Sequence, residues 1–351
     1  MNFTSDNATG AHPAILNAIG VANGGSVGAY GGDALSRSAS DKIAATFERN
    51  GDEAAVFLLG TGTAANALAL AALTPPYGAV YCHRDAHINT DECGAPEMFT
   101  GGAKLIALDG AHGKIAPATL QSVLSQAGHG VHRVTPRVLS LTQSSEAGTV
   151  YTPDEIGTLA DIAHQHGLAV HMDGARFANA VAALNCSPAE LSWKAGVDVL
   201  CFGASKNGAL AAEALIVFAK ADPDDIAFRR KRAGHLFSKM RFIAAQFDAY
   251  LEDGLWLANA RHANAAARRL ADALDEMDGV RLAHPVQANE IFIHLPASMV
   301  TRLEADGAAF YRWAQIPGEE TVLIRLVTAF NTPDDDIDAL IAIARAEAAK
   351  S

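Results

Sequence analysis

Short apolar runs that alternate with helical patterns constrain the fold of this chain more strongly than any other feature. The segments between the runs show helical character, as in the Ala-rich stretch at 63–73. Strands that are apolar along their whole length are typical of parallel sheets, because helices cover both of their faces. The alternation therefore predicts an α/β fold with a mostly parallel sheet. The runs cover residues 54–60, 78–85, 103–109, 137–143, 168–175 and 197–205.

The pattern changes near residue 245. A helix-rich stretch at 248–277 comes first, and a closing helix at about 333–349 ends the chain. Such a mixture is typical of an α+β unit, and 351 residues are enough for two domains. We expect an N-terminal segment and a large domain at 1–245, and a smaller α+β domain at 246–351. The strand candidates of the smaller domain lie at 280–285, 289–295 and 321–330.

Charge and cysteine usage argue against several classes of function. The formal net charge of −12 disfavours a nucleic-acid surface. The four cysteines have no C-x-x-C spacing, and we expect no metal site. No apolar run approaches 18 residues, and the N-terminus lacks the pattern of a signal peptide. We therefore expect a soluble cytoplasmic protein that binds neither nucleic acid nor membrane.

The segment from Gly60 to Asn66 connects a predicted strand to the Ala-rich helix. Glycine lets the backbone approach a ligand closely, and free N–H groups at a helix start favour an anion. Three interpretations stay open: a plain turn, a site for a cofactor phosphate, and a dinucleotide site. The dinucleotide site has some support, because Asp85 ends the next strand about 20 residues further on.

Asp173 and Lys206 each follow a predicted strand. Open α/β sheets bind ligands at the carboxyl ends of such strands. Pyridoxal 5'-phosphate chemistry needs this pair, because the lysine amine forms a Schiff base with the cofactor and the acid keeps the pyridine nitrogen protonated. Each residue alone also fits a capping aspartate or a surface lysine. Their order behind the phosphate loop favours the cofactor site.

His87 is the candidate for stacking on the cofactor ring. It comes just after the predicted strand at 78–85, and an imidazole can also transfer protons near neutral pH. His83, four positions earlier, is a rival for this role. These residues alone leave the choice between the two histidines open, and the family resemblance given next favours His87.

The chain resembles the low-specificity L-threonine aldolases, which have the aspartate-aminotransferase fold, fold type I of the pyridoxal enzymes. The resemblance covers nearly the whole chain and is greatest to the branch of that family known from pseudomonads. It is carried by the segments Ser5-Asp6-Asn7, Ala29-Tyr30-Gly31-Gly32-Asp33, Gly62-Thr63-Ala64-Ala65-Asn66, Ala86-His87 with Glu92, His171-Met172-Asp173-Gly174-Ala175-Arg176, Ser205-Lys206-Asn207-Gly208 and Arg325-Leu326-Val327-Thr328.

The resemblance implies a role for each residue of the cofactor site. Lys206 forms the Schiff base, Asp173 pairs with the pyridinium nitrogen, and His87 stacks on the ring. Arg176 and Lys239 also contact the cofactor. The phosphate is held by the first residues of the helix, which are Gly62, Thr63 and Ala64.

The same comparison implies a substrate site and an assembly. Ser5, Arg176 and Arg325 surround the carboxylate of the amino acid, because the planar fork of arginine suits a carboxylate. Tyr30 and Lys239 match positions that reach a site in the neighbouring subunit. We therefore expect a homo-oligomer, either a dimer or a tetramer.

One segment departs from the pattern of many family members. They carry a histidine after the fifth strand, where this chain has Gln143-Ser144-Ser145-Glu146-Ala147-Gly148. That histidine is a candidate base for the hydroxyl group of the substrate. Glu146, His87 or a bound water takes over this role here.

The resemblance implies a carbon–carbon lyase. We expect it to cleave L-threonine, L-allo-threonine and related β-hydroxy-α-amino acids such as phenylserine to glycine and an aldehyde. The alternatives are a β-eliminating lyase or an aminotransferase with the same cofactor. A non-catalytic ligand-binding homologue is the third alternative, and the joint presence of Lys206, Asp173, Arg176 and Arg325 argues against it.

Overall fold

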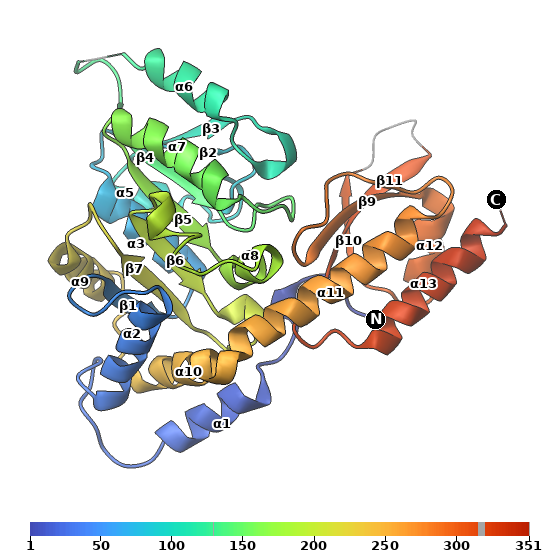
Figure 1. Ribbon diagram of the computed structural model, residues 1–351, viewed down its shortest axis with the longest axis horizontal. Helices are drawn as coiled ribbons and strands as arrows, with labels where there is room; N and C mark the ends of the chain where they lie inside the picture. The colour runs from blue at the N-terminus through green and yellow to red at the C-terminus, as the bar shows by residue number, and fades with distance from the viewer. Residues whose placement is uncertain (129, 315–319, 351) are drawn as a thin grey trace.

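The computed structural model describes residues 1–128, 130–314 and 320–350. Its large unit is built on a seven-stranded sheet with the order β1-β7-β6-β5-β4-β2-β3 (Figure 1). Neighbouring strands from β6 to β3 are all parallel, whereas β7 is antiparallel to both β6 and β1. The predicted mostly parallel α/β sheet is therefore confirmed. The strands are β1 (Ala55–Leu59), β2 (Gly78–His83), β3 (Lys104–Leu108), β4 (Thr135–Thr142), β5 (Ala169–Gly174), β6 (Val199–Gly203) and β7 (Glu213–Val217).

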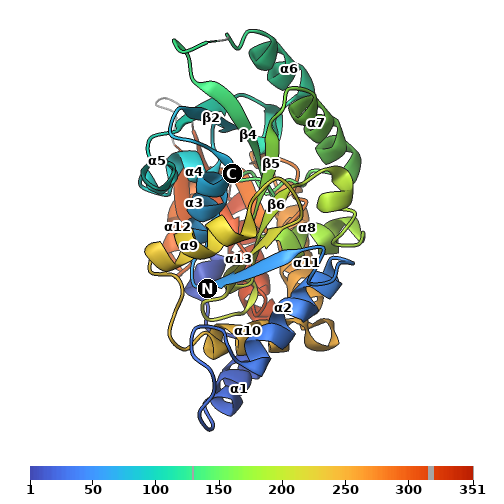
Figure 2. The same cartoon turned by 90° about the vertical axis from the view of Figure 1, so that its left-hand side faces the viewer.

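Helices cover both faces of this sheet (Figure 2). On one face, α3 packs on the central strands and against α5 and α9. On the other face, α7 and α8 pack on β4, β5 and β6, while α2 and α10 pack on β1. The elements are α2 (Ala34–Thr46), α3 (Gly62–Leu73), α4 (His87–Thr90), α5 (Ala95–Thr100), α6 (Pro117–Ser125), α7 (Pro153–Gln165), α8 (Phe177–Leu184), α9 (Pro223–Arg232) and α10 (Arg241–Leu251).

A second, antiparallel sheet with the order β10-β11-β9-β8 forms the smaller unit. Helices α12 and α13 pack against each other beside this sheet, and α13 also packs on α11. These elements are α11 (Leu255–Asp275), β8 (Arg281–Leu282), β9 (Glu290–Pro296), α12 (Ala297–Ala305), β10 (Tyr311–Ala314), β11 (Thr321–Val327) and α13 (Asp334–Ala348).

Helix α11 joins the two units. Its first half places Trp256 and Ala260 in the core of the large unit, and its second half places Leu270 and Leu274 in the core of the small one. The predicted boundary at residue 245 lies inside α10, just before this helix. The division at 245 remains a prediction. We propose that the change from one core to the other occurs within α11.

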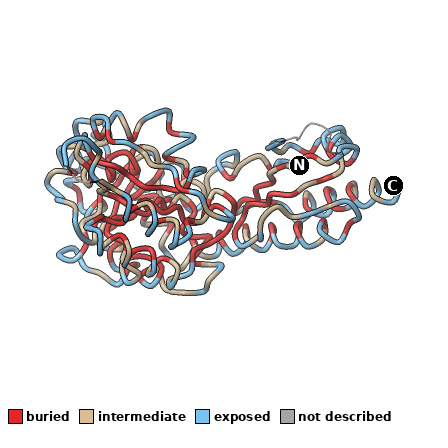
Figure 3. Tube along the Cα trace, turned by 90° about the horizontal axis from the view of Figure 1, so that it is seen from above, coloured by how far each residue is buried: buried red, intermediate tan, exposed pale blue. Residues whose placement is uncertain are grey.

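The N-terminal segment crosses between the units. Phe3 is buried in the core of the small unit, and its amide donates a hydrogen bond of 2.8 Å to the carbonyl of Ala309. The chain then passes through the short helix η1 (Asp6–Ala8) to α1 (Pro13–Ala22), which packs against α10 in the large unit. Both termini therefore lie at the small unit, as Figure 3 shows. Among the described residues, no helix is both long and apolar enough to cross a membrane.

Candidate active site

Asp173 lies at the carboxyl end of β5 and is almost fully buried. Its Oδ1 accepts a hydrogen bond from the amide of Ala175 at 3.0 Å, and its Oδ2 accepts one from Asn66 Nδ2 at 2.8 Å. A buried carboxyl group needs such donors, because leaving water without them is costly. The two bonds hold Asp173 at the edge of the sheet where β5 and β6 end side by side.

Lys206 follows β6 in a short helical turn, η4 (Ser205–Asn207). The turn is anchored by Asn207, whose Nδ2 donates to Tyr250 Oη at 2.7 Å and to the carbonyl of Trp256 at 2.8 Å. Gly208 ends the turn with φ +106°, and a Cβ there would lie 2.8 Å from Asn259 Nδ2. The Asn-Gly pair after Lys206 is therefore required by the turn that presents the lysine.

The start of α3 supplies an anion-binding position. Thr61 caps the helix, with its Oγ1 accepting from the amide of Ala64 at 3.3 Å. The amides of Gly62 and Thr63 belong to the first turn, which has no partners within the helix. Because the positive end of the helix dipole lies here as well, this turn favours a phosphate. Ala64 contributes no free amide, since its N–H is used by the cap.

These elements enclose one cavity of about 310 Å³. It brings together six of the residues predicted from the sequence, whereas Ala64 is buried behind its wall. The six are Gly62, Thr63, His87, Glu146, Asp173 and Lys206. Further lining residues are Asn7, Gly60, Thr61, Asn66, Glu92, Ala175, Ser205, Leu210, Ala211 and Glu213.

A hydrogen-bonded chain links His87 to Asp173 across this cavity. His87 Nδ1 lies 3.0 Å from Glu92 Oε1, which also accepts from Asn66 Nδ2 at 2.8 Å. The hydrogen bond to Glu92 raises the pKa of His87, and burial raises the pKa of Glu92. His83 lies outside this chain, with its Nε2 3.1 Å from the carbonyl of Gly110. Of the two histidines, the structure places His87 at the cavity.

Neither of the two arginines predicted to bind a carboxylate, Arg176 and Arg325, lines this cavity. Arg176 is buried and donates from Nε and Nη2 to both carboxylate oxygens of Asp6. Arg325 lies over the rings of Tyr311 and Trp313 and donates from Nη2 to the carbonyl of Thr4 at 3.2 Å.

The predicted Ser5 is flanked in the chain by two residues that each contact one of these arginines. Its neighbour Asp6 binds Arg176, and its other neighbour Thr4 accepts from Arg325. The Ser5 hydroxyl itself accepts from the amide of Asn7 at 3.1 Å. The three residues predicted to hold a carboxylate therefore converge on one segment of the chain.

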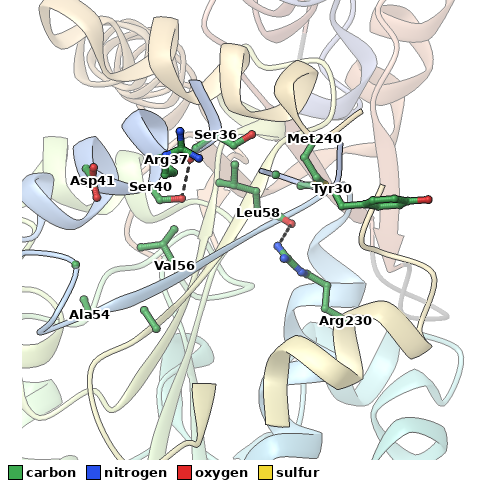
Figure 4. A pocket seen from close by; sticks show the side chains of 13 residues that line it. Tyr30, Ser36, Arg37, Ser40, Asp41, Ala54, Val56, Leu58, Arg230 and Met240 are labelled. Atoms are coloured by element: carbon green, nitrogen blue, oxygen red, sulfur yellow. Dashed lines mark hydrogen bonds between the residues drawn. The ribbon is translucent and has the colours of Figure 1, made fainter. Parts of the chain in front are cut away.

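Tyr30 and Lys239 lie apart from Lys206. Tyr30 lines a separate cavity of about 330 Å³, where Arg230 Nη1 donates to the carbonyl of Leu58 at 3.3 Å (Figure 4). Its ring is half-exposed and faces Lys231 Nζ at 4.5 Å from the ring centroid. Lys239 is exposed. Neither residue lines the cavity that contains Lys206.

Four acids of this region, Asp6, Glu92, Glu213 and Glu290, were not predicted as site residues, and the last two lie outside every segment that carries the family resemblance. Glu213 lies on β7 and lines the cavity, while Glu290 lies on β9 and contacts Arg176. Each is the first residue of a strand whose other residues are mostly apolar, Glu-Ala-Leu-Ile-Val and Glu-Ile-Phe-Ile-His-Leu-Pro. A charged residue in such a run is a usable signal, because buried acids need a partner or a function.

Comparisons with known proteins show the family of this chain. A model of the beta-eliminating lyase family matches residues 2–298. A low specificity L-threonine aldolase of Pseudomonas aeruginosa is 47% identical over 309 residues, which make up 88% of each chain. The chain belongs to the threonine aldolase family. A second low specificity L-threonine aldolase, from Pseudomonas sp., is 41% identical over 98% of this chain and 97% of its own. The family predicted from the sequence is confirmed.

Superposition on solved structures identifies the fold. A threonine aldolase of Leishmania major superposes with a TM-score of 0.91 at 27% identity and covers 99% of both chains. A serine palmitoyltransferase of Sphingomonas wittichii superposes with a TM-score of 0.72 at 15% identity, over 100% of this chain and 87% of its own. The likeness to the second protein concerns the fold alone. The predicted fold type I architecture is confirmed.

Proposed function

We propose that this member of the threonine aldolase family cleaves L-threonine and related β-hydroxy-α-amino acids to glycine and an aldehyde. It is a carbon–carbon lyase, and its cofactor is pyridoxal 5'-phosphate. The observation that carries the proposal is the cavity in which Lys206, Asp173 and the start of α3 meet. A reactive amine, an acid and an anion-binding helix start are the three groups that this cofactor needs.

The residues of the cavity fit the cofactor. The first amides of α3 suit its phosphate, Lys206 suits its aldehyde, and Asp173 suits the protonated nitrogen of its ring. His87 suits the face of the ring. When bound, pyridoxal phosphate supplies an electron sink for the pair left on the substrate Cα after the Cα–Cβ bond breaks.

The protein's own residues direct which bond breaks. We propose that Glu146 takes the proton of the β-hydroxyl group, so that the hydroxyl oxygen becomes the carbonyl oxygen of the leaving aldehyde. Glu146 supports this role because its side chain lines the cavity and also a second one of about 190 Å³ next to it. His87 is the less available base, because the hydrogen bond to Glu92 raises the pKa of His87 and favours the imidazolium, which cannot accept a proton.

The carboxylate of the substrate needs partners of its own. We propose that Ser5, Arg176 and Arg325 receive it, as the family resemblance implies. Support comes from the convergence of all three on the N-terminal segment next to Asn7, which lines the cavity. Holding the carboxylate fixes the rotation about the bond between Cα and the amino nitrogen. This orientation selects the Cα–Cβ bond for cleavage.

Product analysis with the cofactor-loaded protein tests the proposal. We expect L-threonine to give acetaldehyde and glycine in equal amounts, with acetaldehyde measured by a coupled alcohol dehydrogenase and glycine by chromatography. Lys206→Ala should abolish both the visible absorbance of the bound cofactor and the release of aldehyde. Formation of 2-oxobutanoate and ammonia would instead identify a β-eliminating lyase, and a new 2-oxo acid that depends on an amino acceptor would identify an aminotransferase.

Assembly and location are part of the proposal. We propose a homo-oligomer in which Tyr30 and Lys239 complete the site of a neighbouring subunit. Their position outside the cavity of their own chain supports this assignment. We also propose a cytoplasmic location, which suits the four cysteines, all free in the described structure.

A further inference from the structure

Glu290 occupies a position between the two arginines of the proposed carboxylate site. Its side chain on β9 has no exposed surface. One carboxylate oxygen lies 3.1 Å from Arg176 Nη1, and the other lies 4.0 Å from Arg325 Nη1. The two arginines come from the end of β5 and from β11, so that Glu290 links the large unit to the small one.

Each of the three nitrogens of Arg176 already faces an acidic oxygen. Asp6 accepts hydrogen bonds from Nε at 2.7 Å and from Nη2 at 3.0 Å, and Glu290 forms an ion pair with Nη1. Asp6 is the better-held partner, because Asn289 Nδ2 also donates to it at 3.0 Å. Neither oxygen of Glu290 has a well-aligned hydrogen bond in the described structure. A carboxylate that binds Arg176 at Nη1 would therefore compete with Glu290 rather than with Asp6.

The charge balance of this cluster determines whether Glu290 takes up a proton when a carboxylate binds Arg176. Asp6 and Glu290 carry two negative charges, and Arg176 and Arg325 carry two positive ones. A substrate carboxylate would leave this buried cluster with an excess negative charge, which is costly in a low-dielectric surrounding. A proton on Glu290 restores the balance and frees Arg176 Nη1.

The groups around Glu290 favour that proton. Burial raises the pKa of Glu290 to about 7, and Arg176 opposes the shift. Glu146 and Asp6 raise the pKa further, whereas Lys206 lowers it. An added anion acts in the same direction as Glu146 and Asp6.

We propose that Glu290 is an internal counter-ion that takes up a proton and releases Arg176 when the carboxylate of the amino acid binds. This inference rests on the proposed function, because it places the substrate carboxylate at Arg176 and Arg325. It makes Glu290 a positioning residue that acts through the arginines. Binding is then coupled to proton uptake from solvent.

Glycine binding to the cofactor-loaded enzyme tests the coupling. The dissociation constant is measured from the cofactor absorbance at pH 6.5 to 8.5, for the wild type and for Glu290→Gln. In the wild type, affinity should fall by up to about tenfold per pH unit above pH 7, because one proton must be added for each glycine. Ionisation of the glycine amine contributes equally in both proteins.

The Glu290→Gln variant should change the affinity for glycine in an unusual direction. Glutamine is neutral at every pH, so Glu290→Gln should lose the Glu290-dependent slope and bind glycine more tightly than the wild type at pH 8.5. A residue with a purely structural role would weaken binding at all pH values when replaced. Parallel pH profiles for the two proteins, or weaker binding by the variant at pH 8.5, would overturn the inference.

Calorimetry on the wild type gives a second test that needs no variant. Heats of glycine binding at pH 8 in buffers of different ionisation enthalpy report the number of protons taken up. Glycinamide, which lacks the carboxylate, is the matched ligand, and each count is corrected for the ligand's own amine. We expect glycine to take up close to one proton more than glycinamide. Equal counts would contradict the inference, whether or not threonine is cleaved.

The two proposals fail in different ways. Cleavage of threonine together with equal proton counts would leave the proposed function intact and refute the role of Glu290. Glycine-linked proton uptake that Glu290→Gln abolishes, without cleavage of threonine, would support the counter-ion and refute the aldolase.

Discussion

His87 and Glu92 show how a single contact gives a residue its chemical character. Glu92 is fully buried, and its carboxyl group binds both His87 and Asn66. The chain between them forms the single turn of α4 and its C-cap, Asp91. This turn brings Glu92 back towards the imidazole. The contact fixes the orientation of the ring and favours its protonated form.

Replacing Glu92 should therefore change the titration of His87. In Glu92→Gln, we expect the pKa of His87 to fall, because the hydrogen bond to Glu92 is the largest cause that raises it. The imidazole resonances followed by NMR against pH measure this change. Glu155→Gln is the control, since Glu155 pairs with Lys114 away from the cavity. An unchanged His87 titration in Glu92→Gln would contradict the assignment.

The choice of base can be tested with two conservative changes. Glu146→Gln should lower kcat for threonine by about 100-fold or more, the usual contribution of a positioned base, while cofactor absorbance stays as in the wild type. His87→Asn should alter the cofactor spectrum as well, because His87 faces the proposed ring position. A Glu146→Gln enzyme with nearly full kcat would exclude Glu146 as the base.

Among the elements, α7 shows how local sequence determines a helix. Thr152 caps it through a hydrogen bond from the amide of Glu155 at 3.2 Å, and Glu155 accepts from the amide of Thr152 at 2.8 Å. Pro153 occupies the first turn, where its missing N–H costs nothing. The sequence Thr-Pro-Asp-Glu is enough to predict this start without any tertiary information.

Loss of the cap should be measurable. Thr152→Ala should lower the free energy of unfolding by about 1 kcal/mol, because the amide of Glu155 loses its partner. Thr301→Ala in α12 is the matched control, since Thr301 is also exposed but bonds only the carbonyl of Ala297. Urea denaturation measures both, and equal losses would show that the cap adds nothing.

Strand β7 illustrates the opposite case. Its five residues follow closely on β6 and include Glu213, so a sequence pattern gives no clear strand. Pairing with both β1 and β6 determines it. Glu213 lies opposite Gly203, and a Cβ on Gly203 would lie 3.0 Å from Glu213 Oε2. The glycine thus leaves room for a carboxyl group that only the sheet brings there.

For the molecule as a whole, buried acids couple stability to pH. Burial raises the pKa of Glu213 and of Glu290 to about 7 in the folded protein. A raised pKa means that the fold holds the proton more tightly than the unfolded chain. The stabilisation is complete below the ordinary glutamate pKa and is lost as the pH rises through about 7.

This sign gives a prediction for unfolding. The free energy of unfolding should fall between pH 5 and pH 8, and Glu213→Gln should remove up to about 3 kcal/mol of that fall. Urea denaturation at several pH values measures the slope. Glu155→Gln is again the control, because Glu155 is partly exposed and its pKa is lowered. A slope unchanged by Glu213→Gln would contradict the prediction.

The division of labour between sequence and tertiary structure follows from the range of each interaction. Some signals are local to short segments or strand ends. They are the apolar runs, the Thr152 cap, and the order of the phosphate loop, Asp173 and Lys206. These signals suffice to predict the parallel sheet, and they favour a binding site for pyridoxal phosphate. The resemblance then narrows this to the family, which the comparisons confirm.

The neighbours of buried charges depend on segments far apart in the chain. Asp6, Arg176, Glu290 and Arg325 come from four different elements, and no spacing along the chain predicts their meeting. A charge removed from water takes whichever partner the packing of both units places beside it. The residues proposed to hold the cofactor were therefore visible in the sequence, whereas the acid proposed as counter-ion of the two arginines was visible only after folding.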